Sequence, residues 1–113
     1  MLRRSGLNFE RHRTRGIPHA VFAEHIISSG LCFNPNVHWI TFHGAADFGY
    51  LLKTCLGGPL PVDEPSFFEL MDAYFCNYYD LKEMKRDISQ LSMGGGLSKL
   101  AKDLDIERVG VVH

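Results

Sequence analysis

The stretch VHWITFHGAADFGYLL, residues 37–52, places one carboxylate, Asp47, where the residue pattern changes from strand-like to helix-like. Residues 37–42 are β-branched and aromatic on both faces, which predicts a strand covered on both sides. The apolar residues that follow recur at helical spacing, at Phe48, Leu51, Leu52 and Cys55. An acid at this junction lies at the carboxyl end of a strand, where open α/β sheets usually place their chemistry. Asp47 is therefore the leading candidate for a functional residue.

The residues around this junction also have structural interpretations. A carboxylate in the first turn of a helix is stabilised by the helix dipole, so Asp47 need not be catalytic. His43 could share a metal ion with Asp47, or it could be a hydrogen-bonded residue beside the strand end. The glycine run at 94–96 opens a helix but lacks the lysine and serine of a phosphate-binding loop, which favours a hinge.

The composition indicates one small domain without a strong overall charge. The chain has 113 residues, 45% of them hydrophobic, and a net charge of −1, so bulk charge gives no argument for a nucleic-acid partner. Three irregularly spaced cysteines suit reduced thiols in an intracellular compartment and no paired zinc site. No acid, lysine or arginine lies between His25 and Ala46, but residues 34–36 (Asn-Pro-Asn) and three histidines interrupt that stretch, so no membrane span is expected.

The arginine-rich start of the chain allows more than one interpretation. The first fifteen residues carry five arginines, at positions 3, 4, 11, 13 and 15, against the single acid Glu10. This composition suits a transit peptide, a solvated surface or an RNA-contacting patch. Aromatic residues such as Trp39 and Tyr78 could likewise stack on bases, although core packing is the simpler interpretation.

The remaining pattern predicts five helices and two strands. The helices are expected at 18–29, 46–56, 67–75 (opened by a capping box of Ser66 and Glu69), 82–91 and 97–104. The segment NYYDL, residues 77–81, predicts a second strand parallel to the first, so that Asp80 also lies near a strand end. Such a sheet looks incomplete, because a buried parallel pair needs neighbours for its outer backbone groups.

The order of sequence words resembles one family closely, the poly(A)-tail deadenylase nuclease subunit of the CCR-NOT complex, a DEDD-class 3′-to-5′ exonuclease. The matching words are SGLNFERHRTRGI, FAEHIISSGL, NVHWITFHGAADFGYLLK, FFELMDAYF, NYYDLKEMK, GGLSKLAKDLDIERVG and the terminal His113. They cover nearly the whole chain in the right order. Because the arginine-rich start lies inside the matched region, the transit-peptide interpretation loses most of its support.

The resemblance implies a partial RNase H-like α/β domain and a two-metal mechanism. Members of the family remove poly(A) from the 3′ end and release 5′-AMP with two Mg²⁺ ions, which stabilise the attacking and leaving oxygens. The family uses four acids: a D-x-E pair on an early strand, a third Asp that opens a helix after a later strand, and a fourth Asp beyond a histidine. The third acid falls on Asp47, a metal ligand, and the histidine falls on His113, the general base for the attacking water.

The other three acids have no counterpart in the sequence. We therefore expect residues 1–113 to form a single partial exonuclease domain that is truncated at both ends, lacks the leading strands of the sheet and is inactive alone. Residues 44–46, Gly-Ala-Ala, also replace the small polar residue, glycine and tyrosine that the family usually carries. The alternative is a non-catalytic module, a degenerate or truncated nuclease, that docks on the scaffold of the complex.

The family also implies partners and a location. The implied partners are poly(A) RNA, the CCR-NOT scaffold and a partner deadenylase, with no membrane. The implied location is both cytoplasmic and nuclear. The sequence does not indicate which residues would contact RNA.

Overall fold

The computed structural model describes residues 6–87, 94–107 and 109, in which helices pack against one face of a small two-stranded sheet. The elements in chain order are α1 (Phe9–Arg15), α2 (His19–Ser28), β1 (His38–Thr41), α3 (Ala45–Leu56), α4 (Glu64–Tyr74), β2 (Asn77–Asp80), α5 (Leu81–Met84), the 3-10 helix η2 (Lys85–Asp87) and α6 (Leu97–Asp103). Among the described residues, no helix has both the length and the apolar character needed to cross a bilayer.

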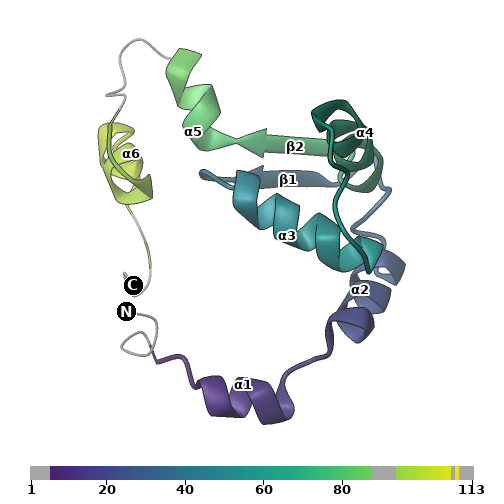
Figure 1. Ribbon diagram of the computed structural model, residues 1–113. Coiled ribbons are helices and arrows are strands. Elements are labelled where there is room, and N and C mark those ends of the chain that lie inside the picture. Colours follow the sequence, from purple (N-terminus) through teal and green to yellow (C-terminus); the bar gives the residue numbers. More distant parts are fainter. Residues whose placement is uncertain (1–5, 88–93, 108, 110–113) are drawn as a thin grey trace.

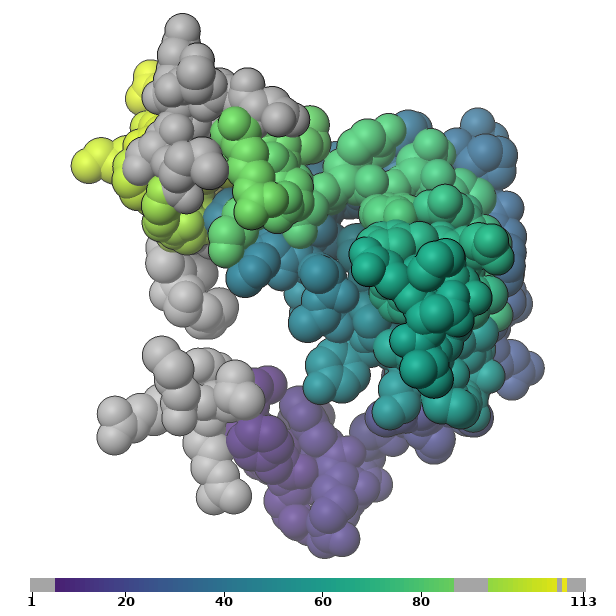
Figure 2. Space-filling model, turned by 45° about the horizontal axis from the view of Figure 1, so that its top comes forward, coloured from purple at the N-terminus to yellow at the C-terminus, as the bar shows by residue number. Residues whose placement is uncertain are grey.

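The two strands pair in parallel, as the sequence predicts. Their register runs from His38 opposite Asn77 to Thr41 opposite Asp80, so the carboxyl ends of β1 and β2 lie side by side. Figure 1 shows α3 running along β1, with α2 next to α3, and α1 and α6 set apart from this group. The turned view in Figure 2 agrees, because α1 (purple) projects away from the teal residues of α3 and α4.

The core lies on one side of the sheet, where α3 and α4 meet the strands. Its buried residues are Cys32, Phe48, Leu52, Met71 and Phe75, with Trp39 and Tyr78 of the strands packed against them. Leu52 and Phe75 have no exposed surface. The helical spacing noted after Asp47 therefore marks the buried face of α3, as expected.

The prediction that the first strand is covered on both sides is wrong for the described part of the chain. Exposed and half-buried residues alternate along β1, and the Ile40 side chain is 65% exposed. Its neighbour on β2, Tyr79, stacks on His38 on the surface. The described helices pack on the Trp39 side of the strand only, so residues suited to burial remain in solvent.

The start of α4 also differs from the prediction. The helix begins at Glu64, and the carboxylate of Asp63 accepts a hydrogen bond from the Ser66 N–H at 2.9 Å. Asp63 is therefore the N-cap, and the predicted Ser66–Glu69 capping box is wrong. Pro65 fits inside the first turn because the N–H groups there have no partner within the helix.

Two further helices depart from the expected pattern. The arginine-rich segment forms α1, which was not predicted, and Asn8 caps it by accepting a hydrogen bond from the Arg11 N–H. The helix expected at 82–91 is instead the single turn α5 followed by η2, and residues 88–93 lie outside the described residues. The other predicted helices, at 18–29, 46–56 and 97–104, are confirmed to within about two residues as α2, α3 and α6.

Candidate functional site

The candidate site is the turn between β1 and α3, which carries Asp47 in the first turn of the helix. Gly44 is the N-cap of α3, and the Phe48 N–H donates to the Gly44 carbonyl at 2.9 Å. Phe48 is buried in the core, whereas Asp47, one residue earlier, is exposed. The turn therefore holds a carboxylate in solvent at the carboxyl end of the sheet, as the sequence predicts.

The turn itself is tight and strained. His43 has a φ of 61°, a left-handed conformation that costs an ordinary residue about 1–2 kcal/mol. Gly44 is buried against the end of β1, and a Cβ at that position would lie 2.5 Å from the Cβ of Thr41. Only glycine fits there without movement of the strand.

Asp80, at the end of β2, holds this turn from the other strand. Its Oδ1 accepts from the His43 N–H and its Oδ2 from the Gly44 N–H, both at 2.8 Å. Oδ1 also accepts from the Lys82 N–H at 2.8 Å and so caps α5. Burial would raise the pKa of this carboxyl, but these backbone donors, joined by the N–H of Glu83, stabilise the anion and lower the pKa below its usual value.

His43 contributes its backbone to the site, and the described contacts give its side chain no catalytic partner. The imidazole is exposed, while the backbone N–H is bonded to Asp80. Among residues 6–87, 94–107 and 109, no group of three histidine, cysteine or carboxylate side chains is placed to hold a metal ion. Asp47 fits one oxygen ligand for a hard cation such as Mg²⁺, and the described residues do not supply the rest of a coordination shell.

The second predicted site residue, His113, lies outside the described residues, so its distance from Asp47 is not defined. The sequence identifies Asp80 only as an acid near a strand end. The signal that could have assigned it is its position at the end of the strand paired with β1, because parallel strands bring their carboxyl ends together. No residue pattern in the sequence indicates that Asp80 would accept hydrogen bonds from backbone N–H groups.

A hollow of about 230 Å³ adjoins the turn on its α4 side. Its walls are mostly apolar and come from Phe48, Phe67, Phe68, Met71 and Tyr78, with Thr41, Ala45 and Asp80 at the sheet edge. The Phe67 and Phe68 rings meet edge to face there. The hollow is suited to a small apolar or aromatic group next to the turn.

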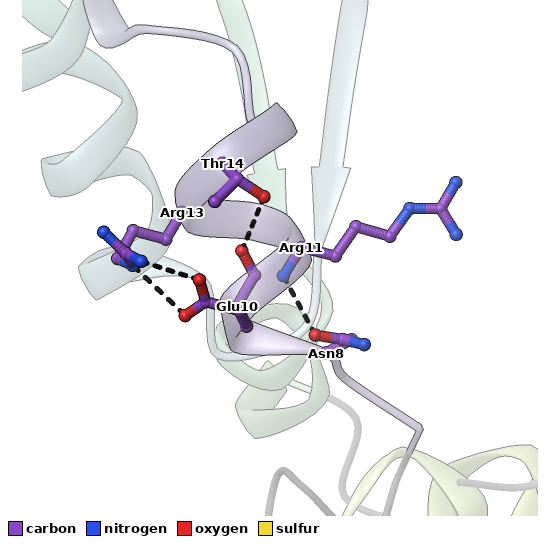
Figure 3. A network of polar contacts seen from close by, with 5 residues as sticks. All are labelled: Asn8, Glu10, Arg11, Arg13 and Thr14. Atoms are coloured by element: carbon purple, nitrogen blue, oxygen red, sulfur yellow. Dashed lines mark hydrogen bonds and ion pairs between the residues drawn. The ribbon is translucent and has the colours of Figure 1, made fainter.

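The arginines of α1 lie apart from this site. Figure 3 shows Arg13 paired with Glu10, at 2.6 Å from Nη2 to Oε1, and the Arg11 side chain extending away from that pair. The Thr14 hydroxyl donates to the Glu10 carbonyl within the same helix. Glu10 partly balances the charge of Arg13, whereas Arg11 and Arg15, the other arginines of α1, are exposed to solvent.

Comparison with known proteins gives a consistent family. Over all 113 residues the chain is 46% identical to the Probable CCR4-associated factor 1 homolog 7 of Arabidopsis thaliana and 41% identical to the Poly(A) ribonuclease pop2 of Schizosaccharomyces pombe. It superposes on the structure of S. pombe Pop2p in its Mg²⁺- and Mn²⁺-bound form with a TM-score of 0.85 over 96% of the chain, at 40% identity. The whole chain therefore corresponds to one segment of the CCR4-associated factor and Pop2 proteins.

The matches cover all or nearly all of this chain but less than half of each related protein. The chain spans 40% of the Arabidopsis protein, 33% of the S. pombe ribonuclease and 42% of the S. pombe Pop2p structure. It also superposes on CAF1 from a structure of yeast NOT1 MIF4G domain co-crystallized with CAF1, with a TM-score of 0.82 over 91% of the chain at 32% identity. No family profile matches the chain. The RNase H-like identity of the described fold, expected from the sequence words, is confirmed by the match to the Pop2 RNase domain.

Proposed function

We propose that this chain is part of a divalent-metal-dependent 3′-to-5′ exonuclease that shortens poly(A) and releases 5′-AMP. The observation that carries the proposal is the exposed Asp47 at the carboxyl end of β1, in a segment that superposes on the metal-bound form of Pop2p. A relative named poly(A) ribonuclease supports the substrate class. The proposed location is the cytoplasm and the nucleus, where poly(A) RNA occurs. The three cysteines are free thiols, which suits a reducing compartment.

In this proposal Asp47 supplies one oxygen ligand to a pair of Mg²⁺ ions, whose chemistry when bound is to stabilise charge on the attacking and leaving oxygens. His113 accepts the proton of the attacking water. The tight turn before Asp47 keeps its carboxylate at the sheet edge, and the α3 dipole stabilises its negative charge. The remaining ligands come from residues beyond those described.

The test uses the chain alone and a chimera in which it replaces the matching segment of S. pombe Pop2p. With 5′-labelled poly(A) and Mg²⁺, we expect laddering from the 3′ end with the chimera and none with the chain alone. Asp47→Asn should lower the chimera's rate by more than about 100-fold, because even outer-shell partners of a metal cost 10–100-fold. Asp72→Asn is the matched control, since its Oδ1 accepts from the Tyr78 hydroxyl and an amide oxygen can do the same. A normal rate for Asp47→Asn would refute the assignment.

A second candidate function is a non-catalytic module that docks on the NOT scaffold beside a partner deadenylase. One observation favours it: the CAF1 of a NOT1 complex superposes on the chain. An open groove of about 720 Å³ between α2 and α3, lined by residues that include Ala23, Ile27 and Cys55, gives such a partner a surface. Binding of the NOT1 MIF4G domain by a chimera that does not cleave poly(A) would select this function, and cleavage would exclude it.

A further inference from the structure

The Asp80 carboxylate joins two segments that are distant in sequence. Both of its oxygens accept backbone N–H groups of the β1–α3 turn, 36 and 37 residues earlier, and Oδ1 also accepts from Lys82. Hydrogen bonds to an ionised acceptor are about twice as strong as neutral ones. The carboxylate is thus a clamp between the end of β2 and the turn after β1.

The turn needs such a clamp because it is unfavourable on its own. His43 is left-handed and Gly44 is pressed against Thr41. An isolated turn with a non-glycine residue at positive φ relaxes to other conformations unless surrounding contacts fix it. The two bonds from Asp80 reach the N–H groups of His43 and Gly44, the residues under that strain.

Asp47 lies between this clamp and the core. On one side, the Gly44 N–H is held by Asp80; on the other, the Phe48 N–H is bonded to the Gly44 carbonyl and the Phe48 ring is buried. The direction of the first turn of α3 is therefore defined at both ends. A change at Asp80 should therefore release the Gly44 end of this turn, which lies three residues before Asp47.

We infer that Asp80 is a positioning residue for Asp47: it fixes the turn from which α3 begins, and does not itself bind metal. Both oxygens of Asp80 already accept backbone N–H groups, those of His43 and Lys82 at Oδ1 and that of Gly44 at Oδ2, so a cation bound there would compete with the clamp. This inference rests on the proposed function, in which Asp47 is the metal ligand.

The first experiment needs no metal. Asp80→Asn preserves shape but turns one acceptor oxygen into an NH₂ group that faces an N–H donor, so at least one clamp bond is lost. In the 113-residue chain we expect amide hydrogen exchange at His43 and Gly44 to become about 10- to 100-fold faster. Asp63→Asn is the control, because Asn caps a helix as well as Asp does, and it should leave both amides unchanged. Unchanged exchange in a folded Asp80→Asn chain would overturn the clamp.

Asp80→Ser provides a second variant, since a serine can still cap α5 but cannot reach His43 and Gly44. If both Asp80 variants unfold while Asp63→Asn stays folded, Asp80 supports the whole domain and the positioning role is wrong. If both variants fold, the amide exchange rates at His43 and Gly44 show in each of them whether the clamp bonds are lost.

The second experiment separates this inference from the proposed function. In the Pop2p chimera, Mn²⁺ affinity measured by electron paramagnetic resonance should fall about 10- to 100-fold with Asp80→Asn, and raised Mn²⁺ should restore cleavage. Asp47→Asn should lose Mn²⁺ binding without rescue. If Asp47→Asn binds Mn²⁺ normally, the proposed function fails. If Asp47→Asn loses the metal and Asp80→Asn does not, the positioning role alone fails.

Discussion

Trp39 of β1 packs edge to face against Phe75, the C-cap residue that follows α4, with ring centroids 5.3 Å apart. Phe75 has no exposed surface and also contacts the rings of Phe48 and Tyr74. The strand and both covering helices therefore share one aromatic centre. The stability of the domain depends on it, because a small core has few other large buried side chains.

Phe75→Ala should destabilise the chain by about 3–5 kcal/mol, from lost burial and the cavity left behind. This is a large fraction of the 5–15 kcal/mol that holds a typical domain together, so the variant should be mostly unfolded at 37 °C. Urea denaturation followed by circular dichroism measures the change. Phe68→Ala is the control, because that ring is 44% exposed, and it should cost about 1 kcal/mol or less. Equal losses in the two variants would contradict the described core.

Two glycines near Asp47 should respond to alanine with opposite signs. Gly44→Ala places a Cβ against Thr41 and should cost about 1–3 kcal/mol by overpacking. Gly49→Ala, within α3, meets open space and should stabilise the chain by about 0.5–1 kcal/mol, since glycine is a poor helix former. Melting temperatures of the two variants check the signs. A stabilising Gly44→Ala would mean that the turn is looser than described.

The Asp80 clamp should make stability depend on pH in acid. Its folded pKa lies below the unfolded value of about 3.9, so its contribution is complete above that value and is lost as pH falls through the folded pKa. Urea unfolding of wild type and Asp80→Asn should therefore differ most at pH 6 and converge toward pH 3. A difference that stays constant down to pH 3 would show that the charge of Asp80 is not what holds the turn.

The cysteines should differ in reactivity. Burial, and then the neighbouring Cys55, raise the pKa of Cys32 to about 11, so about one molecule in a thousand carries the Cys32 thiolate at pH 8. Cys76 is half-buried, and it makes the smallest of the contributions that raise the pKa of Cys32. With a thiol reagent at pH 8, mass spectrometry should find Cys76 modified first and Cys32 only after unfolding in urea. Rapid modification of Cys32 in the folded chain would contradict its place in the core.

The cap of α4 gives a direct test of a corrected prediction. Asp63→Ala removes the acceptor for the Ser66 N–H and should cost about 1 kcal/mol. Ser66→Ala keeps the backbone N–H donor and removes only the hydroxyl, which makes a second bond to Asp63, so it should cost less than Asp63→Ala. Thermal melts of the two variants compare them, and a reversed order would restore the capping box at Ser66.

The sequence was sufficient for those parts of the fold that local rules determine. The helical spacing of Phe48, Leu52 and Cys55 predicted the buried face of α3, and the separation of two apolar segments by helices predicted the parallel pairing. The predicted start of α4 is too late because Ser66 and Glu69 match a capping box, although Asp63 suits an N-cap and Pro65 suits a first helical turn. The bare side of β1 could not be predicted, since Ile40 has the same residue type whether or not another segment covers it.

The candidate site, like the fold, is predicted from the sequence only in part. Asp47 was found from its position at a strand end, which is a sequence property. The clamp was not, because it joins a side chain to the backbone N–H groups of His43 and Gly44, and backbone groups are the same in every sequence. Family resemblance added the role of His113, and neither residue pattern nor described geometry tests that role.

The span of the Asp80 clamp has a consequence for synthesis of the chain on the ribosome. Gly44 is made 36 residues before the carboxylate that holds it. At about 5–20 residues per second, that delay is about 2–7 seconds. During this interval the nascent turn lacks the carboxylate that holds it and relaxes to other conformations. A pause in translation between the two residues would therefore delay formation of the native turn and prolong exposure of the incomplete segment to chaperones and proteases.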